Sequence, residues 1–466
     1  MGARLRISAG QYDILCAHLL PGDGLEAAPV MLCGRRADHD GPILLCRDIL
    51  CVPHKERQRE PDRLKWQITS IVDPLVRAAK DNLSVIKIHS HPGNLDGFSP
   101  LDDESDRAFF SSLYAWSSDE VPHGSCIIRS DGRIRVRTVG ADGSFRPIET
   151  VMIVGDDLKA WHASDDARPT ANFALRHAQV FGSETTSTLQ SLAVGVVGCS
   201  GTGSPVVEQL SRLGVGRLVL VDPDRVERVN LNRILNATEA DAQSGALKVD
   251  VLARAVGQMG TGTRVKAIPS SICTPEAVHA VAGCDVLFGC VDGVEGRHVM
   301  NRLATFYLLP YFDVGVRIDA DGRGGVSSIW GSVHYIQPGG SSLLSRGVYS
   351  LDDYRADALR REDPLLYGQL RKHKYIKGVQ EAQPAVVSIN MHLASMAVLE
   401  LLARIHPYRY EENRHYAVTR VSLSDMSSHN EPEGEPCPLF SRHIGRGDVD
   451  PALDMPGLSV TEGIRC

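Results

Sequence analysis

The stretch that decides the fold of the larger part of this chain is Leu192-Ala193-Val194-Gly195-Val196-Val197-Gly198-Cys199-Ser200-Gly201-Thr202-Gly203-Ser204. Its first part, 192–197, is an apolar run, as in a strand buried on both faces of a parallel sheet. A helical pattern follows over 206–213, and a second apolar run, 217–221, ends at Asp222. This order predicts a strand–helix–strand unit. The backbone amides of its turn, which holds Gly198, Gly201 and Gly203, would face a phosphate group, and Asp222 would face a ribose.

On its own this unit would suggest a dinucleotide enzyme, but the residues beyond it change that interpretation. The run Asp222-Pro223-Asp224 is followed by Asn230-Leu231-Asn232-Arg233, and Lys248 stands at the predicted start of a later helix. An apolar strand-like run, 285–291, then ends at Asp292. In this order the set resembles the adenylating family of ThiF, MoeB and the ubiquitin-activating enzymes, over roughly 173–430. The segment 175–182, with Arg176, resembles the arginine segment at the family's N-terminal end.

The resemblance implies that ATP and Mg²⁺ are used to adenylate the C-terminal glycine of a ubiquitin-like or sulfur-carrier protein. Such a reaction needs phosphate charge to be neutralised and magnesium to be held. It also implies a homodimer formed through this domain, because in some relatives the residue matching Arg176 reaches the phosphates of the neighbouring protomer. The implied nucleotide-site residues are Gly198, Gly201, Gly203, Asp222 and Asp224 around the nucleotide, Asn230, Arg233 and Lys248 at the phosphates, and Asp292 at magnesium.

The cysteines of this region depart from the family pattern. Relatives often carry Cys-x-x-Cys pairs that hold a structural zinc, and many carry a cysteine that accepts the acyl group. Here no cysteine occurs between Cys290 and Cys437, and Ser342 and Ser345 stand where a relative has one pair. We therefore expect no zinc in this domain, and any acyl adduct on Ser342 or Ser345 rather than on Cys437. Direct transfer of the adenylate to a partner stays open.

A second cluster of metal-ligating residues stands in the N-terminal part of the chain. The run Val85-Ile86-Lys87-Ile88-His89-Ser90-His91-Pro92 reads as a strand, so His89 and His91 share a face. Ser99 and Asp102 follow after a loop that can return the carboxylate to the two rings. Two imidazoles, one carboxylate and an open fourth position form a typical catalytic Zn²⁺ arrangement.

This second motif resembles that of the JAMM/MPN+ metalloproteases, also called JAB, which cleave ubiquitin-like proteins from their conjugates. The family motif, His-x-His-Pro followed by Ser and then Asp, is complete here. The resemblance implies that His89, His91 and Asp102 hold zinc and that Ser99 stabilises the oxyanion. It also implies a glutamate as general base on an early strand, for which Glu26 in the segment 25–34 is the candidate.

The length of 466 residues suits two or three domains at about 150 residues each. We predict an α/β protein in which residues 1–158 form a JAMM/MPN-type domain and 173–430 form a Rossmann-like, doubly wound adenylating domain. Residues 159–172 are predicted as a polar linker and 431–466 as a C-terminal extension.

Composition excludes several other classes. A net charge of −7 argues against nucleic-acid binding, and no apolar run approaches the length of a membrane span. The N-terminal residues lack the apolar core of a secretory signal. The eleven cysteines are scattered without any Cys-x-x-Cys pair, which indicates a reducing cytoplasm.

Together the two motifs predict a bifunctional enzyme of a prokaryotic ubiquitin-like pathway. The zinc half would process a precursor or remove a conjugate, and the other half would adenylate the exposed C-terminus, in some pathways for a conjugating-enzyme-like partner. The alternative is an enzyme that activates and processes a sulfur carrier for cofactor or amino-acid biosynthesis. A non-catalytic scaffold is disfavoured, because both sets of motif residues are complete.

Overall fold

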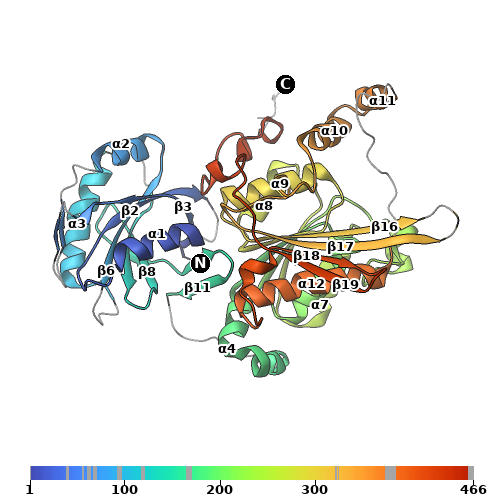
Figure 1. Cartoon of the computed structure of the whole chain (residues 1–466), viewed down its shortest axis with the longest axis horizontal. Coiled ribbons are helices and arrows are strands. Elements are labelled where there is room, and N and C mark those ends of the chain that lie inside the picture. Colours follow the sequence, from blue (N-terminus) through green and yellow to red (C-terminus); the bar gives the residue numbers. More distant parts are fainter. Residues whose placement is uncertain are drawn as a thin grey trace. The chain divides into compact units, whose positions relative to one another are not determined.

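The computed structural model describes residues 2–37, 41–54, 57–59, 64–66, 71–91, 97–116, 121–163, 171–320, 323, 325–372 and 385–459. The chain divides into two compact α/β units (Figure 1). The first comprises Met1–Asp166 with the short segments Phe306–Leu308 and His443–Asp448. The second comprises Ala167–Thr305, Leu309–Arg442 and Val449–Cys466.

The first unit is built on a nine-stranded mixed sheet with the order β11-β10-β1-β3-β2-β6-β7-β8-β9. A separate two-stranded sheet pairs β4 with β5 in antiparallel register. The elements are β1 (Arg4–Ser8), α1 (Ala9–Leu19), β2 (Pro29–Arg36), β3 (Ile43–Cys51), β4 (Arg57–Arg59), β5 (Leu64–Trp66), α2 (Val72–Lys80), β6 (Ser84–His91), α3 (Pro100–Tyr114), β7 (His123–Arg129), β8 (Ile134–Val139), β9 (Phe145–Pro147), β10 (Thr150–Val154) and β11 (Leu158–His162).

Strand β6 lies in the interior of this sheet, antiparallel to β2 and parallel to β7, and every residue along it is buried. Val30 and Val85 from the sheet pack with Leu75 from α2 and with Phe110 and Leu113 from α3 in one apolar cluster. Burying an apolar side chain of this size contributes roughly 1.5–3 kcal/mol. This packing fixes α3 against the sheet, and α3 begins just before Asp102.

Two details differ from the sequence-based expectation for the first unit. The strand predicted over 25–34 begins only at Pro29, so Glu26 lies in the extended segment that leads into β2. Proline is suited to the first residue of a strand because it has no amide hydrogen to donate to the ladder. Strand β11 occupies Leu158–His162, where we predicted the start of the linker.

The second unit contains an eight-stranded sheet with the order β14-β13-β12-β15-β16-β17-β18-β19. The first five strands are parallel and the last three are added antiparallel. The main elements are α4 (Leu175–Ser191), β12 (Ala193–Val197), α5 (Gly203–Arg212), β13 (Arg217–Val221), α6 (Glu239–Ser244), α7 (Lys248–Met259), β14 (Arg264–Ile268), α8 (Pro275–Ala282), β15 (Val286–Gly289), α9 (Val294–Phe306), β16 (Tyr311–Ala320), β17 (Val326–Ile336), α10 (Leu351–Glu362), α11 (Pro364–Lys372), α12 (Val387–Ile405), β18 (Val418–Ser422) and β19 (Ser427–Glu431).

Helices cover both faces of this second sheet, with α8 and α9 on one face and α7 and α12 on the other (Figure 1). From β12 the chain first builds outward through β13 and β14, and then continues on the other side with β15 and β16. The strand order therefore reverses between β12 and β15, which confirms the doubly wound sheet. In such sheets ligands bind outside the carboxyl ends of the strands at this switch point.

In the described ranges, no helix combines the length and the apolarity that a transmembrane helix needs.

Candidate functional site

The glycine-rich turn lies at the switch point of the second sheet, between β12 and α5. Gly198 has a φ of +91°, and a Cβ on it would collide with the carbonyl oxygen of Cys290. A Cβ on Gly203 would collide with the carbonyl oxygen of Gly198, so this glycine lets the turn close on itself. Gly201 is required for another reason, because a Cβ there would collide with the side-chain amide of Asn390 on α12.

Asp222 and Asp224 follow the end of β13, and Asp222 contacts this turn. Asp222 is buried, and its Oδ2 accepts a hydrogen bond of 2.7 Å from the amide of Cys199. Burial raises the pKa of Asp222, and the nearby Lys248 ammonium opposes that rise. Asp224 accepts a 2.7 Å hydrogen bond from Nζ of Lys248, the first residue of α7. The predicted phosphate lysine therefore lies near the predicted ribose acid, Asp222, and is bonded directly to Asp224.

The other predicted phosphate residues lie on the short segment after β13. Asn230 is buried and accepts a hydrogen bond of 3.1 Å from the amide of Glu227. Arg233 is half-buried, its Cδ lies 3.3 Å from the position of a Cβ on Gly201, and its Nη1 donates to the carbonyl of Val229 at 2.9 Å. Arg233 therefore flanks the glycine turn.

Two further predicted residues are exposed. Asp292 follows β15, next to β12 at the switch point, and its carboxylate is open to solvent. An exposed carboxylate at this edge suits Mg²⁺, which keeps several waters and takes one or two protein carboxylates. Arg176 lies in the first turn of α4 and is also exposed.

The serine segment forms a buried polar turn. Ser342 is 3 % exposed, and its amide donates a 2.9 Å hydrogen bond to Oγ of Ser345, which is exposed. Cys437 is 2 % exposed, and its amide donates to the carbonyl of Gly340 at 3.0 Å. The residues at the positions of the relatives' cysteine pairs therefore do lie together. Their hydrogen bonds give the serines a structural role here, and acyl transfer to Ser342 or Ser345 stays a prediction.

In the first unit, His89, His91 and Asp102 converge, as the sequence predicts. Nε2 of His89 lies 3.0 Å from Nε2 of His91 and 3.0 Å from Oδ1 of Asp102, and Nε2 of His91 lies 3.5 Å from Oδ2 of Asp102. Zinc–ligand bonds of about 2.0–2.1 Å place neighbouring tetrahedral ligands about 3.3 Å apart. The three side chains therefore lie close to the spacing of tetrahedral zinc ligands, with a different oxygen of Asp102 facing each ring. They are the one metal-ligating group of three found among the described residues.

Protonation at this cluster favours metal binding. Burial lowers the pKa of His89, which keeps its imidazole neutral, the form that binds a metal. Burial alone would raise the pKa of Asp102, but hydrogen bonds from His89 and His91 hold it well below its usual range. A carboxylate and neutral rings are the protonation states that a zinc site requires.

Ser99 is the N-cap of α3 and holds Asp102 in place. Its Oγ donates to Oδ2 of Asp102 at 2.8 Å, and its backbone amide donates to the same oxygen at 2.7 Å. The amide of Asp102 donates back to Oγ of Ser99 at 3.2 Å, which completes a capping box. These contacts orient the ligand carboxylate, and the predicted oxyanion role of Ser99 stays a prediction.

Glu26 lies on the face of the sheet that carries the two histidines. The amide of Ala27 donates to Oγ of Ser90 at 3.0 Å, and the amide of Ser90 donates to the carbonyl of Ala27 at 3.1 Å. Strand β2 sets Val30 opposite Lys87, and continuing this antiparallel register puts Ala27 opposite Ser90 and Glu26 opposite His91. Directly opposed residues of antiparallel strands share a face. Glu26 is buried there, at 8 % exposure.

The sequence did not single out the ionic network beside this cluster. Asp106 is fully buried one helical turn after Asp102, and it accepts hydrogen bonds of 2.8 Å from Nζ of Lys87 and from Nη2 of Arg137. Lys87 lies two residues before His89 on the same face of β6. The one indication in the sequence is Lys87, a lysine inside an otherwise apolar strand. Its buried partner, Asp106, explains why a lysine can stand there.

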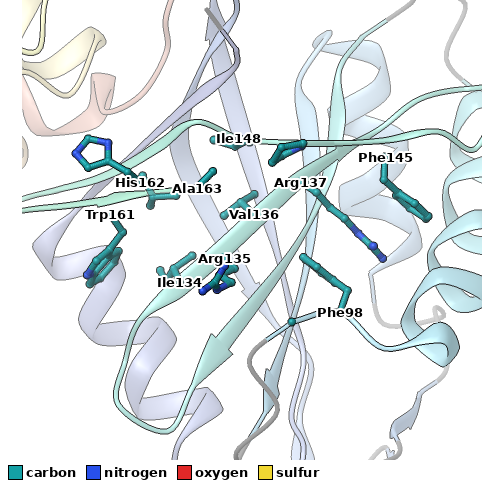
Figure 2. A pocket seen from close by; sticks show the side chains of 13 residues that line it. Phe98, Ile134, Arg135, Val136, Arg137, Phe145, Ile148, Trp161, His162 and Ala163 are labelled. Carbon is teal, nitrogen blue, oxygen red and sulfur yellow. The ribbon is translucent and has the colours of Figure 1, made fainter. Parts of the chain in front are cut away.

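A cavity of about 260 Å³ adjoins the N-terminal end of α3 (Figure 2). The Arg137 guanidinium lies between the rings of Phe98 and Phe145, 3.7 Å from each centroid, and Trp161 stands on the other side of the cavity. The lining residues are Gly97, Phe98, Ile134, Arg135, Val136, Arg137, Phe145, Pro147, Ile148, Val151, Trp161, His162 and Ala163. One wall of this mostly apolar cavity belongs to Gly97 and Phe98, in the segment that leads into α3.

Comparison with known families identifies the second unit. The ThiF family matches residues 174–438, which is more than half of the chain. This protein belongs to the ThiF family. The match contains every predicted residue of the nucleotide site, from Arg176 to Asp292, and also the serine segment and Cys437.

Individual relatives of this ThiF protein match shorter stretches. Ubiquitin-like modifier-activating enzyme 5 of Culex quinquefasciatus is 28 % identical over 163 residues, which is 32 % of this chain and 38 % of the relative. Adenylyltransferase and sulfurtransferase MOCS3 of Mus musculus is 38 % identical over 113 residues, which is 24 % of each chain. The chain thus spans less than two fifths of each of these relatives. The solved structure of E. coli MccB with ATP is 19 % identical, with a TM-score of 0.43, over 58 % of this chain and 74 % of that one.

Proposed function

We propose that the second unit adenylates the C-terminal carboxylate of a ubiquitin-like or sulfur-carrier protein with ATP. The observation that carries the proposal is the convergence of the glycine turn, Asp222 and Lys248 at the switch point of a ThiF-family sheet. Asp222 would bind the ribose, and Lys248 and Arg233 would neutralise phosphate charge. Asn230 and Asp224 would complete the nucleotide site.

In the proposed reaction, an oxygen of the carrier carboxylate attacks the α-phosphorus of ATP. The bond between the α-phosphorus and the bridging oxygen breaks, so the products are the acyl-adenylate and pyrophosphate. Magnesium, when bound, supplies charge neutralisation at the phosphates, and Asp292 would hold it. The chain itself contributes fixed donors aimed at the phosphate oxygens, which is how electrostatic stabilisation of such a transition state works. Arg176 would serve a neighbouring protomer in a homodimer.

We propose that the activated carrier leaves this unit as the adenylate and is passed to a separate acceptor. Ser342 and Cys437 are both almost fully buried, and both take part in the hydrogen bonds of one turn. The exposed Ser345 remains the candidate for an oxyester on the chain itself. Intact mass of the protein after incubation with ATP, Mg²⁺ and a carrier separates these routes, because an oxyester adds the carrier's mass whereas a released adenylate does not.

For the first unit we propose zinc-dependent cleavage after the C-terminal glycine of the same class of carrier. The tetrahedral spacing of His89, His91 and Asp102 supports this proposal, as does the placement of Glu26 opposite His91. Zinc, when bound, would supply a Lewis acid and an acidified water. Glu26 would take a proton at its carboxylate and later deliver it to the leaving amine, while Ser99 keeps Asp102 oriented.

Two experiments test these proposals separately. Carrier-dependent exchange of pyrophosphate into ATP, measured with a panel of glycine-terminated ubiquitin-like proteins, should occur with the wild type and survive Glu26→Gln. Cleavage of carriers that carry a C-terminal extension should be lost in Glu26→Gln, although zinc content stays near one per chain, because the base is not a ligand. Exchange that never depends on a carrier would contradict the first proposal, and full cleavage by Glu26→Gln would contradict the second.

The two candidate carrier classes are a ubiquitin-like protein used in conjugation and a sulfur carrier. The names of the matched relatives divide in the same way, between a ubiquitin-like modifier-activating enzyme and an adenylyltransferase and sulfurtransferase.

A further inference from the structure

Asn390 is a polar residue that belongs to no motif of the sequence but touches the glycine turn. It lies in the first turn of α12, and only 4 % of its surface is exposed. Its Nδ2 occupies the space that a Cβ on Gly201 would need, and Cδ of Arg233 lies 3.3 Å from the same point. The carboxamide and a predicted phosphate arginine therefore both pack against the turn.

The side chain of Asn390 makes no hydrogen bond within the part of the chain that the structure describes, although it is almost completely buried. Asn413, another asparagine that is 4 % exposed, does have a partner in the chain: its Nδ2 donates a hydrogen bond to the carbonyl of Ala403 at 2.8 Å. Oδ1 and Nδ2 of Asn390 are not among the fully buried unpaired atoms, so they keep some access to solvent. A carboxamide that has no hydrogen-bond partner in the described ranges and lies against the turn is placed to bind a ligand there.

The turn beside Asn390 offers more donors of the same kind. The amides of Gly201, Thr202 and Gly203 donate to no acceptor in the described ranges, and they lie at the N-terminal end of α5. Together with Nδ2 of Asn390 and the guanidinium of Arg233, they form a set made only of donors. Such a set requires a ligand that supplies only acceptors, and a helix N-terminus favours one with negative charge.

We propose that Asn390 is a nucleotide-binding residue that donates a hydrogen bond from Nδ2 to a phosphate oxygen of a nucleoside triphosphate at the Gly201 turn. This inference rests on the proposed adenylating function and adds to it a donor from α12, far along the chain. A triphosphate fits better than the carrier's single carboxylate, because three amides, a carboxamide and a guanidinium exceed what two oxygens accept. It also explains why position 201 is glycine.

The test is calorimetric binding of α,β-methylene-ATP and of adenosine to the full chain and its variants. Asn390→Ala removes the donor, and the isosteric Asn390→Asp replaces it with a carboxylate. Asn413→Ala is the matched control, because it alters an equally buried asparagine that is bonded to backbone elsewhere on the second unit. Circular dichroism of each variant establishes that it is folded, and the isosteric variant keeps the test open if the alanine variant does not fold.

We expect Asn390→Ala to lower the affinity for the triphosphate analogue on the order of tenfold. Adenosine should bind all variants with equal affinity. Asn390→Asp should lower the affinity for the analogue further. Added salt should restore part of that loss, because salt screens the repulsion between carboxylate and phosphate. Equal losses for both ligands would overturn the inference in favour of a shaping role. Unchanged analogue affinity, with a raised KM for the carrier, would assign Asn390 to the carrier instead. If the wild type and the Asn413→Ala control bind neither ligand, the proposed function itself fails.

Discussion

At the scale of single residues, Lys248 is held by neighbouring acids within the proposed nucleotide site. Its ammonium is almost buried and pairs with Asp224 at 2.7 Å, beside the Asp222 carboxylate. The ion pair holds the charge at the carboxyl edge of the sheet, where α7 begins.

Lys248→Ala should lower carrier-dependent pyrophosphate exchange by on the order of 10² or more, because fixed charges at a developing phosphate transition state are worth several kcal/mol. Lys266→Ala, which removes an exposed lysine on β14, is the matched control and should leave the rate unchanged. A loss of similar size in both variants would mean that general charge, and not the position of Lys248, supports the reaction.

Residue patterns predicted the parts of the sites that lie close together in sequence. His89, His91, Ser99 and Asp102 lie on one strand and the helix that follows it. The run from Gly198 to Arg233 covers one turn, α5, β13 and the segment after β13, so short stretches of sequence already order these residues. Asn390 could not be predicted in this way, because only the packing of α12 beside α5 brings it to Gly201. The strand bounds around Glu26 were also missed, since nothing local marks where the ladder begins.

At the scale of elements, strand β6 and helix α3 are joined by charges as well as by apolar packing. Asp106 bonds Lys87 and Arg137 while fully buried, and Asp102 lies on the same helix one turn earlier. The geometry of the metal ligands therefore depends on how this helix is held against the strand.

Asp106→Ala should destabilise the first unit by about 3–5 kcal/mol, because it removes the buried carboxylate that two cations share. Arg137 would keep its pair with Asp103, whereas Lys87 would keep only the hydroxyl of Ser105. It should also weaken zinc binding, since α3 carries Asp102. Glu104→Ala, on the exposed face of the same helix, should change stability by less than about 0.5 kcal/mol. Urea unfolding and zinc content measure both effects. An Asp106→Ala protein that matches the control would show that apolar packing alone fixes α3.

The pairing of β6 with β7 should be sensitive to acid through His123. Burial, together with the charge of Arg35, lowers the pKa of His123 to about 4, and its Nδ1 accepts a 3.0 Å hydrogen bond from the amide of Val85. In the unfolded chain this imidazole takes up its proton near pH 6.5. Its contribution to stability is therefore complete above about pH 6.5, and it is lost as the pH falls toward 4.

The melting temperature of the wild type should fall between pH 6.5 and 4.5, and the part due to His123 has an upper limit of about 3 kcal/mol. His123→Asn should flatten this dependence, because Oδ1 of asparagine can accept from the same amide and does not titrate in this range. Parallel pH profiles for the two proteins would assign the acid sensitivity to other groups.

At the scale of the whole molecule, the chain joins two α/β units with separate candidate chemistries. Position on a sheet explains both sites, since one lies at the switch point of the parallel strands and the other on strand β6 with the helix that follows it. The fold class and the doubly wound sheet followed from buried apolar runs and the glycine turn. Two short segments, Phe306–Leu308 and His443–Asp448, belong to the first unit although their neighbours in sequence belong to the second. No pattern in the sequence predicts this assignment.

If the two proposed activities act in sequence on one carrier, cleavage must precede adenylation, because only a free C-terminal glycine carboxylate can attack ATP. The most direct test is the intact mass of a carrier offered in two forms, one ending in glycine and one with a C-terminal extension, after incubation with ATP and Mg²⁺. The wild type should give the AMP adduct of the glycine-ended carrier from both forms, and Glu26→Gln should give it only from the form that already ends in glycine. An adduct formed by Glu26→Gln from the extended form, or no adduct from either form with the wild type, would contradict the account.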